Sequence, residues 1–288
     1  MPSAVSKAVL ITGCSSGIGR AAAERLAGRG WSVYASARRP ESIEDLSACG
    51  CRLLQLDVTD EASMRAAVQQ VEDEQGAVGV LVNNAGYSQG GPIEQVSMQA
   101  VRRQFETNVF GLIYLTQLVL PKMRAQRWGR IVNIGSMGGR LTFPGGGLYH
   151  ASKYALEAIS DALRFEVRGF GIDVIVLQPG LILTHFGEAA AASMDTLAPN
   201  GNAAGPYGAF NETVAKATRE VYENPLLARF GGPPEVVAKV IERAIAARRP
   251  RARYRITTSA HVLIAQRKLV SDRMWDRMMR LQFPQPRQ

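Results

Sequence analysis

The sequence predicts an α/β fold of a single domain built on a doubly wound parallel sheet, and three observations lead to this prediction. Six short stretches are rich in Val, Ile and Leu with little polar alternation, which is typical of strands buried on both faces. Helix-like stretches separate them, and this alternation favours helices on both sides of a parallel sheet. The chain has 288 residues, of which 46% are hydrophobic, enough for one large core.

Each expected element can be placed by residue number. The expected strands are residues 7–12, 31–37, 51–58, 78–83, 129–135, 171–178 and, near the C-terminus, 253–258. The expected helices are residues 18–29, 60–75, 97–126, 149–168 and 233–249. Residues 186–232 are rich in Ala, Gly, Asn and Pro and break the alternation, so we expect a mobile insertion with one or two short helices that acts as a lid. We expect residues 1–258 to form the main domain and residues 259–288 an extension packed on it.

The net charge of +9 is concentrated in the C-terminal extension. Residues 249–288 hold ten Lys/Arg and two Asp/Glu, whereas the rest of the chain holds 24 and 23. Residues 261–283 have helical period, which places Val270, Met274, Met278 and Leu281 on one face, flanked by Arg273, Arg277 and Arg280. Such a helix can pack on its own fold, join a subunit or lie on an anionic membrane surface. We expect no nucleic-acid partner, because no recognised binding fold accompanies the charge.

Cysteine and histidine usage indicates the compartment and argues against a metal site. The three cysteines are Cys14, Cys49 and Cys51, an odd and sparse set that favours a reducing, cytoplasmic setting. The three histidines and three cysteines have no ligand spacing, so we expect no metal. We also expect no signal peptide, because the N-terminal residues lead directly into the glycine-rich segment of residues 12–20, and no membrane span, because no apolar run reaches roughly 18 residues.

The segment TGCSSGIGR, residues 12–20, lies between the first expected strand and the first expected helix. Backbone N–H groups at a helix start lack internal partners, and glycines let the chain approach a pyrophosphate closely. Residues 17–22, GIGRAA, fit the dinucleotide pattern G-x-G-x-x-A, whereas a P-loop would need Gly-Lys-Ser/Thr. The alternative is that these glycines serve helix packing alone.

The end of the second strand indicates which dinucleotide binds. An acidic residue expected there would bind the ribose 2′-hydroxyl of NAD, and an arginine would bind the 2′-phosphate of NADP. Ala37 stands where the acid is expected, and Arg38 and Arg39 follow it. Their guanidinium groups favour NADP(H), while Glu41 keeps NAD(H) as the alternative.

A tyrosine and a lysine supply a proton-transfer pair. Tyr149 and Lys153 lie four residues apart in an expected helix, so their side chains share one face. A free tyrosine is a poor base at neutral pH because its pKa is near 10, and a nearby ammonium favours the phenolate. Ser136 follows an expected strand at the sheet edge where such folds bind ligands, and its hydroxyl would stabilise a reacting oxygen. His150 lies about 100° around the helix from Tyr149, so we expect a supporting or surface role.

Together these motifs resemble the classical short-chain dehydrogenases/reductases, over about residues 5–185. The motifs that carry the resemblance are TGCSSGIG (12–19), NNAG (83–86), Asn108, Ser136, YHASK (149–153) and PGLILT (179–184). The resemblance implies a Rossmann fold, a homodimer or homotetramer built on helices 97–126 and 149–168, and oxidoreductase activity. It also implies that Lys153 grips the nicotinamide ribose, that Asn108 completes a proton relay to it, that Asp57 binds adenine and that Thr184 touches the carboxamide.

The expected site follows from the motifs and this resemblance. The expected catalytic residues are Asn108, Ser136, Tyr149 and Lys153. The expected cofactor-binding residues are Gly13, Ser15, Ser16, Gly17, Ile18, Gly19, Arg38, Arg39, Asp57, Val58, Asn84, Ala85, Gly86, Pro179, Gly180 and Thr184.

The substrate is expected to be a bulky hydrophobic ketone or alcohol. The candidate pocket walls are apolar, although several could simply pack the core: Leu141, Phe143, Leu148, Phe186, Met194, Leu197, Tyr207 and Phe210. A loose likeness to the 17β-hydroxysteroid and retinol dehydrogenase members suggests a steroid-, retinoid- or lipid-like compound. The alternative function is a cofactor-binding regulatory or scaffold protein without turnover.

Overall fold

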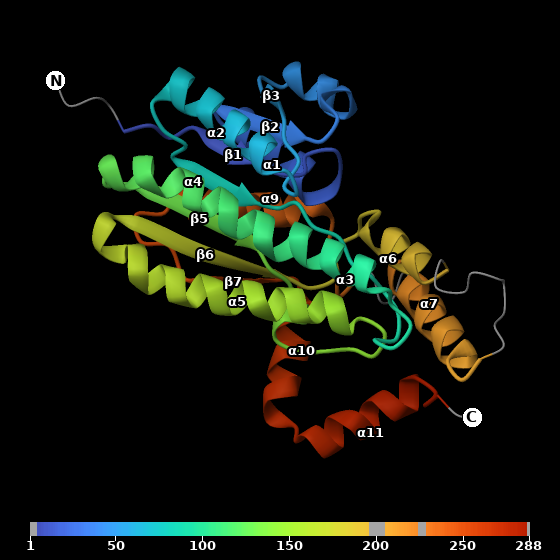
Figure 1. Ribbon diagram of the computed structural model, residues 1–288. Coiled ribbons are helices and arrows are strands. Elements are labelled where there is room, and N and C mark those ends of the chain that lie inside the picture. The colour runs from blue at the N-terminus through green and yellow to red at the C-terminus, as the bar shows by residue number, and fades with distance from the viewer. Residues whose placement is uncertain (1–4, 196–204, 224–228, 287–288) are drawn as a thin grey trace.

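The computed structural model describes residues 5–195, 205–223 and 229–286, and it shows a seven-stranded sheet with helices on both faces (Figure 1). The strand order is β3-β2-β1-β4-β5-β6-β7 and every neighbouring pair is parallel. The order reverses between β1 and β4, the point where open α/β sheets bind ligands. The predicted Rossmann-type α/β fold is therefore confirmed.

All seven expected strands are present. They are β1 (Val9–Ile11), β2 (Val33–Ala37), β3 (Arg52–Gln55), β4 (Val80–Asn83), β5 (Gly129–Ile134), β6 (Ile172–Pro179) and β7 (Arg253–Ile256). All residues of β1, β2, β4 and β5 are buried, as their continuous apolar sequences indicate.

Helices fill the connections between the strands, and two more follow β7. They are α1 (Gly17–Ala27), α2 (Glu61–Gln75), α3 (Met98–Phe105), α4 (Gly111–Ala125), α5 (Gly147–Val167), α6 (Phe186–Asp195), α7 (Gly208–Glu223), α9 (Pro234–Ala246), α10 (Thr258–Leu269) and α11 (Asp272–Gln282). Short 3₁₀ helices are η1 (Pro40–Ser47), η3 (Met137–Gly139) and η4 (Arg168–Phe170), and η2 (Glu106–Phe110) is a π-helical turn.

The sheet separates two apolar cores, and alternate residues of one strand enter different cores. Val9 and Ile11 of β1 pack with α1 and α9, while Leu10 packs with α2 and α4 on the other face. Helices α2, α4 and α5 lie on the near face of the sheet in Figure 1, with α9 behind it. This sandwich leaves the carboxyl ends of the strands at one edge, where the expected site residues gather.

Two helices of the insertion pack against each other beside that edge. Met194 of α6 and Phe210 and Val214 of α7 form a small apolar cluster. The hydroxyl of Tyr207 donates to Glu94 Oε2 over 2.6 Å, which ties the insertion to the loop after β4. Leu197, an expected pocket wall, lies outside the described residues.

The C-terminal extension differs from the single helix expected over residues 261–283. Helix α10 ends at Leu269, and Ser271 starts α11 with an extended backbone (φ −70°, ψ 162°) that resets the helical phase. The predicted apolar stripe is therefore wrong in part: Met274 is 49% and Leu281 83% exposed. The buried residues of α11 are Trp275 and Met279, which pack with Leu141 and Ile264.

The positive charge of the C-terminal extension raises the question of how the chain could contact a membrane. Within the described residues, none of the helices is both long enough and apolar enough to cross a membrane.

Candidate active site

The glycine loop after β1 has the geometry of an anion-binding turn. Gly13 and Gly17 have positive φ angles of 72° and 58°, which favour glycine. A Cβ on Gly19 would lie 2.4 Å from Gly13 O, so a larger residue there would push the helix away from the turn. Helix α1 begins at Gly17 with no side-chain cap, because the exposed Ser16 makes no capping hydrogen bond. The N–H groups of Gly17 and Ile18 at this helix start therefore suit a pyrophosphate, and exposed Ser15 and Ser16 lie beside them.

The segment after β4 is fastened to the glycine loop. Asn84 Nδ2 donates to Thr12 O over 2.8 Å and to Gly13 O over 3.0 Å. Thr12 Oγ1 accepts from the N–H groups of Asn84 and Ala85 at 3.0 and 2.9 Å. The side chain of Asn84 thus holds the two segments together, and the exposed backbone of Gly86 borders the open edge.

The ends of β2 and β3 bring the residues that would contact the adenosine half. Ala37 pairs with Gln55, so Arg38 and Asp57 lie just beyond neighbouring strand ends. Arg38 and Arg39 are both exposed, as a group that binds a phosphate from solvent must be. Asp57 Oδ1 accepts from the N–H and the hydroxyl of Thr59 at 2.9 and 2.8 Å, which fixes the carboxylate. The adjacent Val58 is buried, and a Cβ on Gly111 would lie 2.2 Å from its carbonyl oxygen.

Asn108 lies in the π-helical turn η2 between α3 and α4, within one long expected helix. The wider turn is closed by the N–H of Gly111, which donates to Glu106 O five residues earlier. Asn108 is only 2% exposed, and its amide exchanges two hydrogen bonds with the backbone of Tyr87 at 3.1 and 3.0 Å. Its Nδ2 also donates to Ser152 Oγ over 3.0 Å. The π turn therefore aims this amide at α5.

Tyr149 and Lys153 lie on one face of α5, as expected from their spacing. Lys153 is 6% exposed, its Nζ donates to Ile134 O over 2.8 Å, and the same nitrogen lies 5.8 Å from the ring centroid of Tyr149. Burial lowers the pKa of Lys153 to about 8. A Cβ on Gly86 would lie 3.1 Å from Asn108 Oδ1 and 3.8 Å from Lys153 Nζ. Three expected site residues, Gly86, Asn108 and Lys153, therefore meet at one point, and the ring of Tyr149 lies beside Lys153.

Ser136 follows β5 and starts η3. Its Oγ accepts from Gly138 N over 3.0 Å, which orients the hydroxyl at the strand end. The same turn contacts α5, because a Cβ on Gly138 would lie 2.6 Å from His150 Nδ1 and 3.3 Å from Ser136 Oγ. The loop and the helix that carry Ser136 and Tyr149 are therefore in direct contact.

His150 is a supporting residue whose function the sequence left open. It is buried, its Nδ1 lies 3.0 Å from Gly138 O, and its Nε2 accepts from Phe143 N over 3.2 Å. A carbonyl on one side and an N–H on the other require the neutral ring with the proton on Nδ1. Burial lowers the pKa of His150, which favours this neutral form. His150 therefore fixes the loop that carries Ser136 relative to α5.

The segment after β6 completes the site. Gly180 follows Pro179, and a Cβ on Gly180 would lie 2.2 Å from Ser259 Oγ, so the residue must be small. The methyl group of Thr184 lies 3.3 Å from the Cβ position of Gly17, so this segment covers the start of α1. The ring of Phe186 lies 5.5 Å from that of Tyr149. The insertion thus begins directly beside the expected base.

Three further candidate pocket walls lie at different places in the fold. Leu141 is fully buried beneath α10 and α11, and this packing agrees with the alternative that it belongs to the core. Phe143 lies between α5 and α11, with its ring 6.1 Å from that of His150 and 6.0 Å from that of Trp275. Leu148 is half-buried in the first turn of α5.

Trp275, which supports the site from the C-terminal extension, was not among the residues expected from the sequence. Its Nε1 donates to Thr142 O over 3.2 Å, beside Phe143. The aromatic series Trp275, Phe143 and His150 therefore connects α11 to the helix of Tyr149. The signal in the sequence was a tryptophan within a basic helix. Its burial was not apparent, because one unbroken helix over residues 261–283 would place Trp275 off the apolar face.

These features fit a nicotinamide dinucleotide. The uncapped helix start would take the pyrophosphate, the ends of β2 and β3 the adenosine half, and the point where Asn108 and Lys153 meet at Gly86 the nicotinamide half. Such a fold and site define a dinucleotide-binding oxidoreductase of the α/β class.

Comparisons with known proteins identify the family. A family model described as short chain dehydrogenase matches residues 7–195, and the chain belongs to this family. It is 35% identical over 278 residues to the NADPH-dependent 3-dehydrocapnine reductase of Ornithobacterium rhinotracheale, covering 93% of this chain and 94% of that protein. It is 44% identical over 179 residues to the 3-ketodihydrosphingosine reductase of Bacteroides thetaiotaomicron, covering 62% and 65%. A solved short-chain dehydrogenase/reductase of Burkholderia phymatum, in complex with NAD, is 26% identical with a TM-score of 0.74, covering 91% and 92%.

Proposed function

We propose that this protein transfers a hydride between NADP(H) and a carbonyl or secondary alcohol of a bulky hydrophobic compound. The observation that carries the proposal is the meeting of Asn108 Oδ1 and Lys153 Nζ at Gly86, beside Tyr149. In this arrangement a proton donor, a cation and a polar amide border one open strand edge. The alternative, a cofactor-binding protein without turnover, would need Lys153 to hold the ribose but would not need Tyr149 as a proton donor beside it.

Each side chain has a distinct role in the proposed reaction. The bound cofactor supplies the hydride. Tyr149 donates a proton to the substrate oxygen, and Ser136 Oγ donates a hydrogen bond to the same oxygen. Lys153, whose pKa is about 8, carries a positive charge at neutral pH and stabilises the phenolate left on Tyr149. Asn108, anchored by Tyr87 and Ser152, positions a water molecule through which a proton from solvent reaches Lys153.

Turnover tests this proposal against the silent alternative. We expect oxidation of NADPH, followed at 340 nm, with hydrophobic ketones, and a loss of kcat of at least ~100-fold in Tyr149→Phe. Tyr154→Phe is the matched control, since Tyr154 is 44% exposed one turn further along α5. Equal activity in Tyr149→Phe would refute the assigned role, and no turnover with any ketone or alcohol would favour the silent alternative.

The preference for NADP(H) is supported by the two exposed guanidinium groups at the end of β2 and by the NADPH dependence stated in the name of one relative. We expect Arg38→Ala to raise the KM for NADPH by ~10- to 100-fold, because a charge-assisted phosphate contact is lost, and to leave the KM for NADH unchanged. Arg168→Ala, an exposed arginine at the end of α5, is the control. A KM for NADH equal to that for NADPH in the unaltered protein would contradict the preference.

A lipid-like substrate is supported by the apolar lid beside Tyr149 and by the names of two relatives. Phe186 of α6 faces Tyr149, and Met194 and Phe210 lie in the cluster behind it. The first probes are 3-ketodihydrosphingosine and 3-dehydrocapnine, the compounds in those names. We expect kcat/KM for them to exceed that for acetone by at least ~100-fold, since each buried methylene adds binding energy. A flat dependence on chain length would contradict a hydrophobic pocket.

Self-association belongs to the same proposal. Two exposed aromatic side chains of α5, Tyr154 (44%) and Phe165 (89%), support a homodimer or homotetramer built on α4 and α5. We expect a dimer or larger species in analytical ultracentrifugation and a monomer for Phe165→Glu. A monomer in the unaltered protein would contradict this part of the proposal.

The cytoplasm is the proposed location, and the C-terminal extension is a proposed contact with anionic membranes. The three cysteines are free in the structure, and Cys14 and Cys51 are buried. Helix α11 exposes Leu281 and Met274 beside Arg273, Arg277 and Arg280, which suits the surface of an anionic bilayer. Co-sedimentation with anionic vesicles, lost in Met274→Asp/Leu281→Asp, would support the contact, and no co-sedimentation would refute it.

A further inference from the structure

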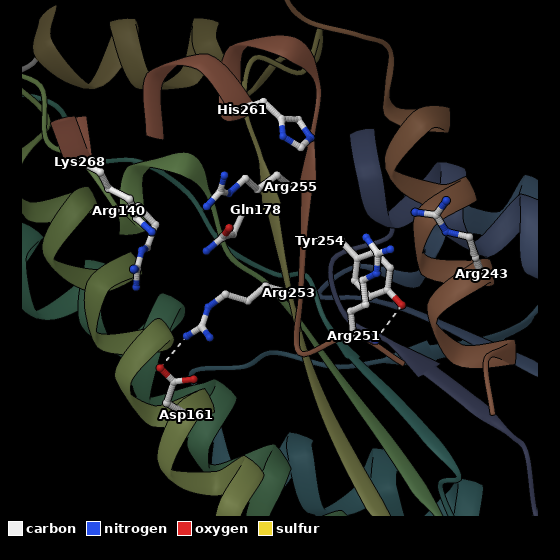
Figure 2. A pocket seen from close by; sticks show the side chains of 10 residues that line it. All are labelled: Arg140, Asp161, Gln178, Arg243, Arg251, Arg253, Tyr254, Arg255, His261 and Lys268. Atoms are coloured by element: carbon white, nitrogen blue, oxygen red, sulfur yellow. Dashed lines mark hydrogen bonds and ion pairs between the residues drawn. The ribbon is translucent and has the colours of Figure 1, made fainter. Parts of the chain in front are cut away.

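A cavity lies along the edge strand β7, and none of the expected catalytic or cofactor-binding residues lines it. Its volume is about 630 Å³, within the range of small-molecule sites. Figure 2 shows its lining side chains, which come from the loop after η3, from α5, α9 and α10, from the loop before β7 and from the last two strands. It is therefore formed by segments far apart in the sequence.

The cavity holds a large excess of positive charge. Six Lys or Arg side chains line it, against a single carboxylate, that of Asp161. Only one of the six is fully neutralised: Arg253 donates from Nε to Glu157 Oε2 over 2.8 Å and from Nη2 to Asp161 Oδ2 over 2.6 Å. Arg243 instead stacks on the ring of Tyr254 at 5.5 Å, a contact that leaves its charge in place.

Besides Arg243, four cations at the cavity lack a closely paired carboxylate. Among the described residues, Arg251, Arg255 and Lys268 have no ion pair within 4.0 Å, and the nearest carboxylate to Arg140, that of Glu157, is 3.9 Å away and already bound to Arg253. In Figure 2, Arg140, Arg255 and Lys268 surround one open space. Like charges held in a concave surface raise the local potential and attract an anion.

The backbone of β7 adds neutral donors to the same place. Within the described residues strand β7 pairs with β6 alone, and the carbonyls of Ala252 and Ile256 accept from Val176 N of β6 and from Gly180 N just after it. Because alternate residues of a parallel strand face opposite neighbours, the N–H groups of Arg253 and Arg255 point away from the sheet. An oxyanion at this edge can therefore meet N–H groups and guanidinium forks together.

We infer that this cavity is a binding site for the phosphate group of a small phosphorylated compound, separate from the dinucleotide site. Arginine presents a planar fork that matches phosphate oxygens, and several unneutralised cations suit a group with two negative charges. The same chemistry is offered by a free phosphate ester or pyrophosphate and by a phospholipid headgroup. The inference does not depend on the proposed reaction.

Thermal melting of the full chain with inorganic pyrophosphate tests the site. At a pyrophosphate concentration about ten times its Kd, we expect the Tm to rise by roughly 2–5 °C over sodium chloride of equal ionic strength. The rise should fall by more than half in Arg255→Gln/Lys268→Gln, two exposed side chains whose exchange leaves the core intact. Lys239→Gln on α9, also exposed, is the matched control and should keep the full rise.

The dinucleotide site requires its own control, because it also suits pyrophosphate. A rise that survives Arg38→Gln and is lost in Arg255→Gln/Lys268→Gln supports the second site. A rise in Tm that is lost in Arg38→Gln and kept in the double variant, or that equals the rise given by sodium chloride, overturns it.

If the rise supports the site, vesicles of phosphatidic acid and phosphatidylcholine identify the source of the phosphate. Pelleting that is lost in the double variant assigns the site to a lipid headgroup, and pelleting unchanged by that variant or no pelleting assigns it to free phosphate compounds.

Discussion

Lys153→Met should make the protein more stable at neutral pH while abolishing turnover. Burial lowers the pKa of Lys153 from 10.5 to about 8, so holding the charged amine inside the protein costs ~3 kcal/mol at pH 7. Methionine avoids this cost and loses the 2.8 Å hydrogen bond to Ile134 O, worth ~1–2 kcal/mol. The variant should therefore gain ~1–2 kcal/mol at pH 7.

The difference should reverse with pH. Because the folded pKa is lower than the unfolded one, the unfolded chain binds more protons between pH 8 and pH 10.5, and the unaltered protein gains stability as the pH rises through this window. Above it the amine is neutral in both states, so the variant should be less stable by the lost hydrogen bond. Melting of both proteins from pH 7 to pH 10.5 measures this crossover, with a Tm difference of about 2–6 °C at pH 7. A variant that is less stable at every pH by a constant amount would refute the reasoning.

Three further predictions concern residues around the site. His150→Gln should lower stability, and its Tm deficit should narrow as the pH falls from 7 to 5. The reason is that the folded pKa of His150 lies below its unfolded value, so the unaltered protein loses stability on acidification; a constant deficit would contradict a buried neutral ring. Trp275→Ala should lower the free energy of unfolding, measured in urea, by ~3 kcal/mol. It should also lower kcat with little change in the KM for NADPH, because Trp275 supports the loop of Phe143. An unchanged kcat would show that α11 does not support the site. Gly180→Ala should lower the free energy of unfolding by ~1–3 kcal/mol, because its Cβ would meet Ser259 Oγ. Gly169→Ala, which has open space at the Cβ position, is the control and should lower it by less than ~1 kcal/mol. Equal Tm values for the two variants would show that the chain relaxes around Gly180.

The strands and the sheet were predictable because each strand is buried on both faces. The run of residues 78–83, for example, has no polar position until Asn83, and burial of every residue of β4 follows directly. The spacing of Tyr149 and Lys153 likewise fixed their shared face, since four residues are close to one helical turn. Local periodicity carries this information without any tertiary contact.

Three features were not predictable, each because a distant contact decides it. Periodicity does not register the one extra residue of the π turn at Asn108, which has its partners at Tyr87 and Ser152. The phase of α11 depends on the break at Ser271. His150 was placed about 100° from the base, but the loop of residues 138–143 covers that side of the helix and buries the ring.

The π turn at η2 also sets a constraint on how this chain can change its length. The π turn contains one residue more than a regular helix would have between α3 and α4. The faces of these two helices are therefore offset by about 100° compared with an unbroken helix. Gln104 on α3 depends on that offset, since its buried amide accepts from Gln89 N over 2.6 Å and donates to Tyr87 O over 2.8 Å. Deletion of a single residue between positions 106 and 110 would restore a regular helix and turn Gln104 towards solvent. Length changes in homologous sequences should therefore fall outside this segment, even though a helix is elsewhere tolerant of conservative substitution.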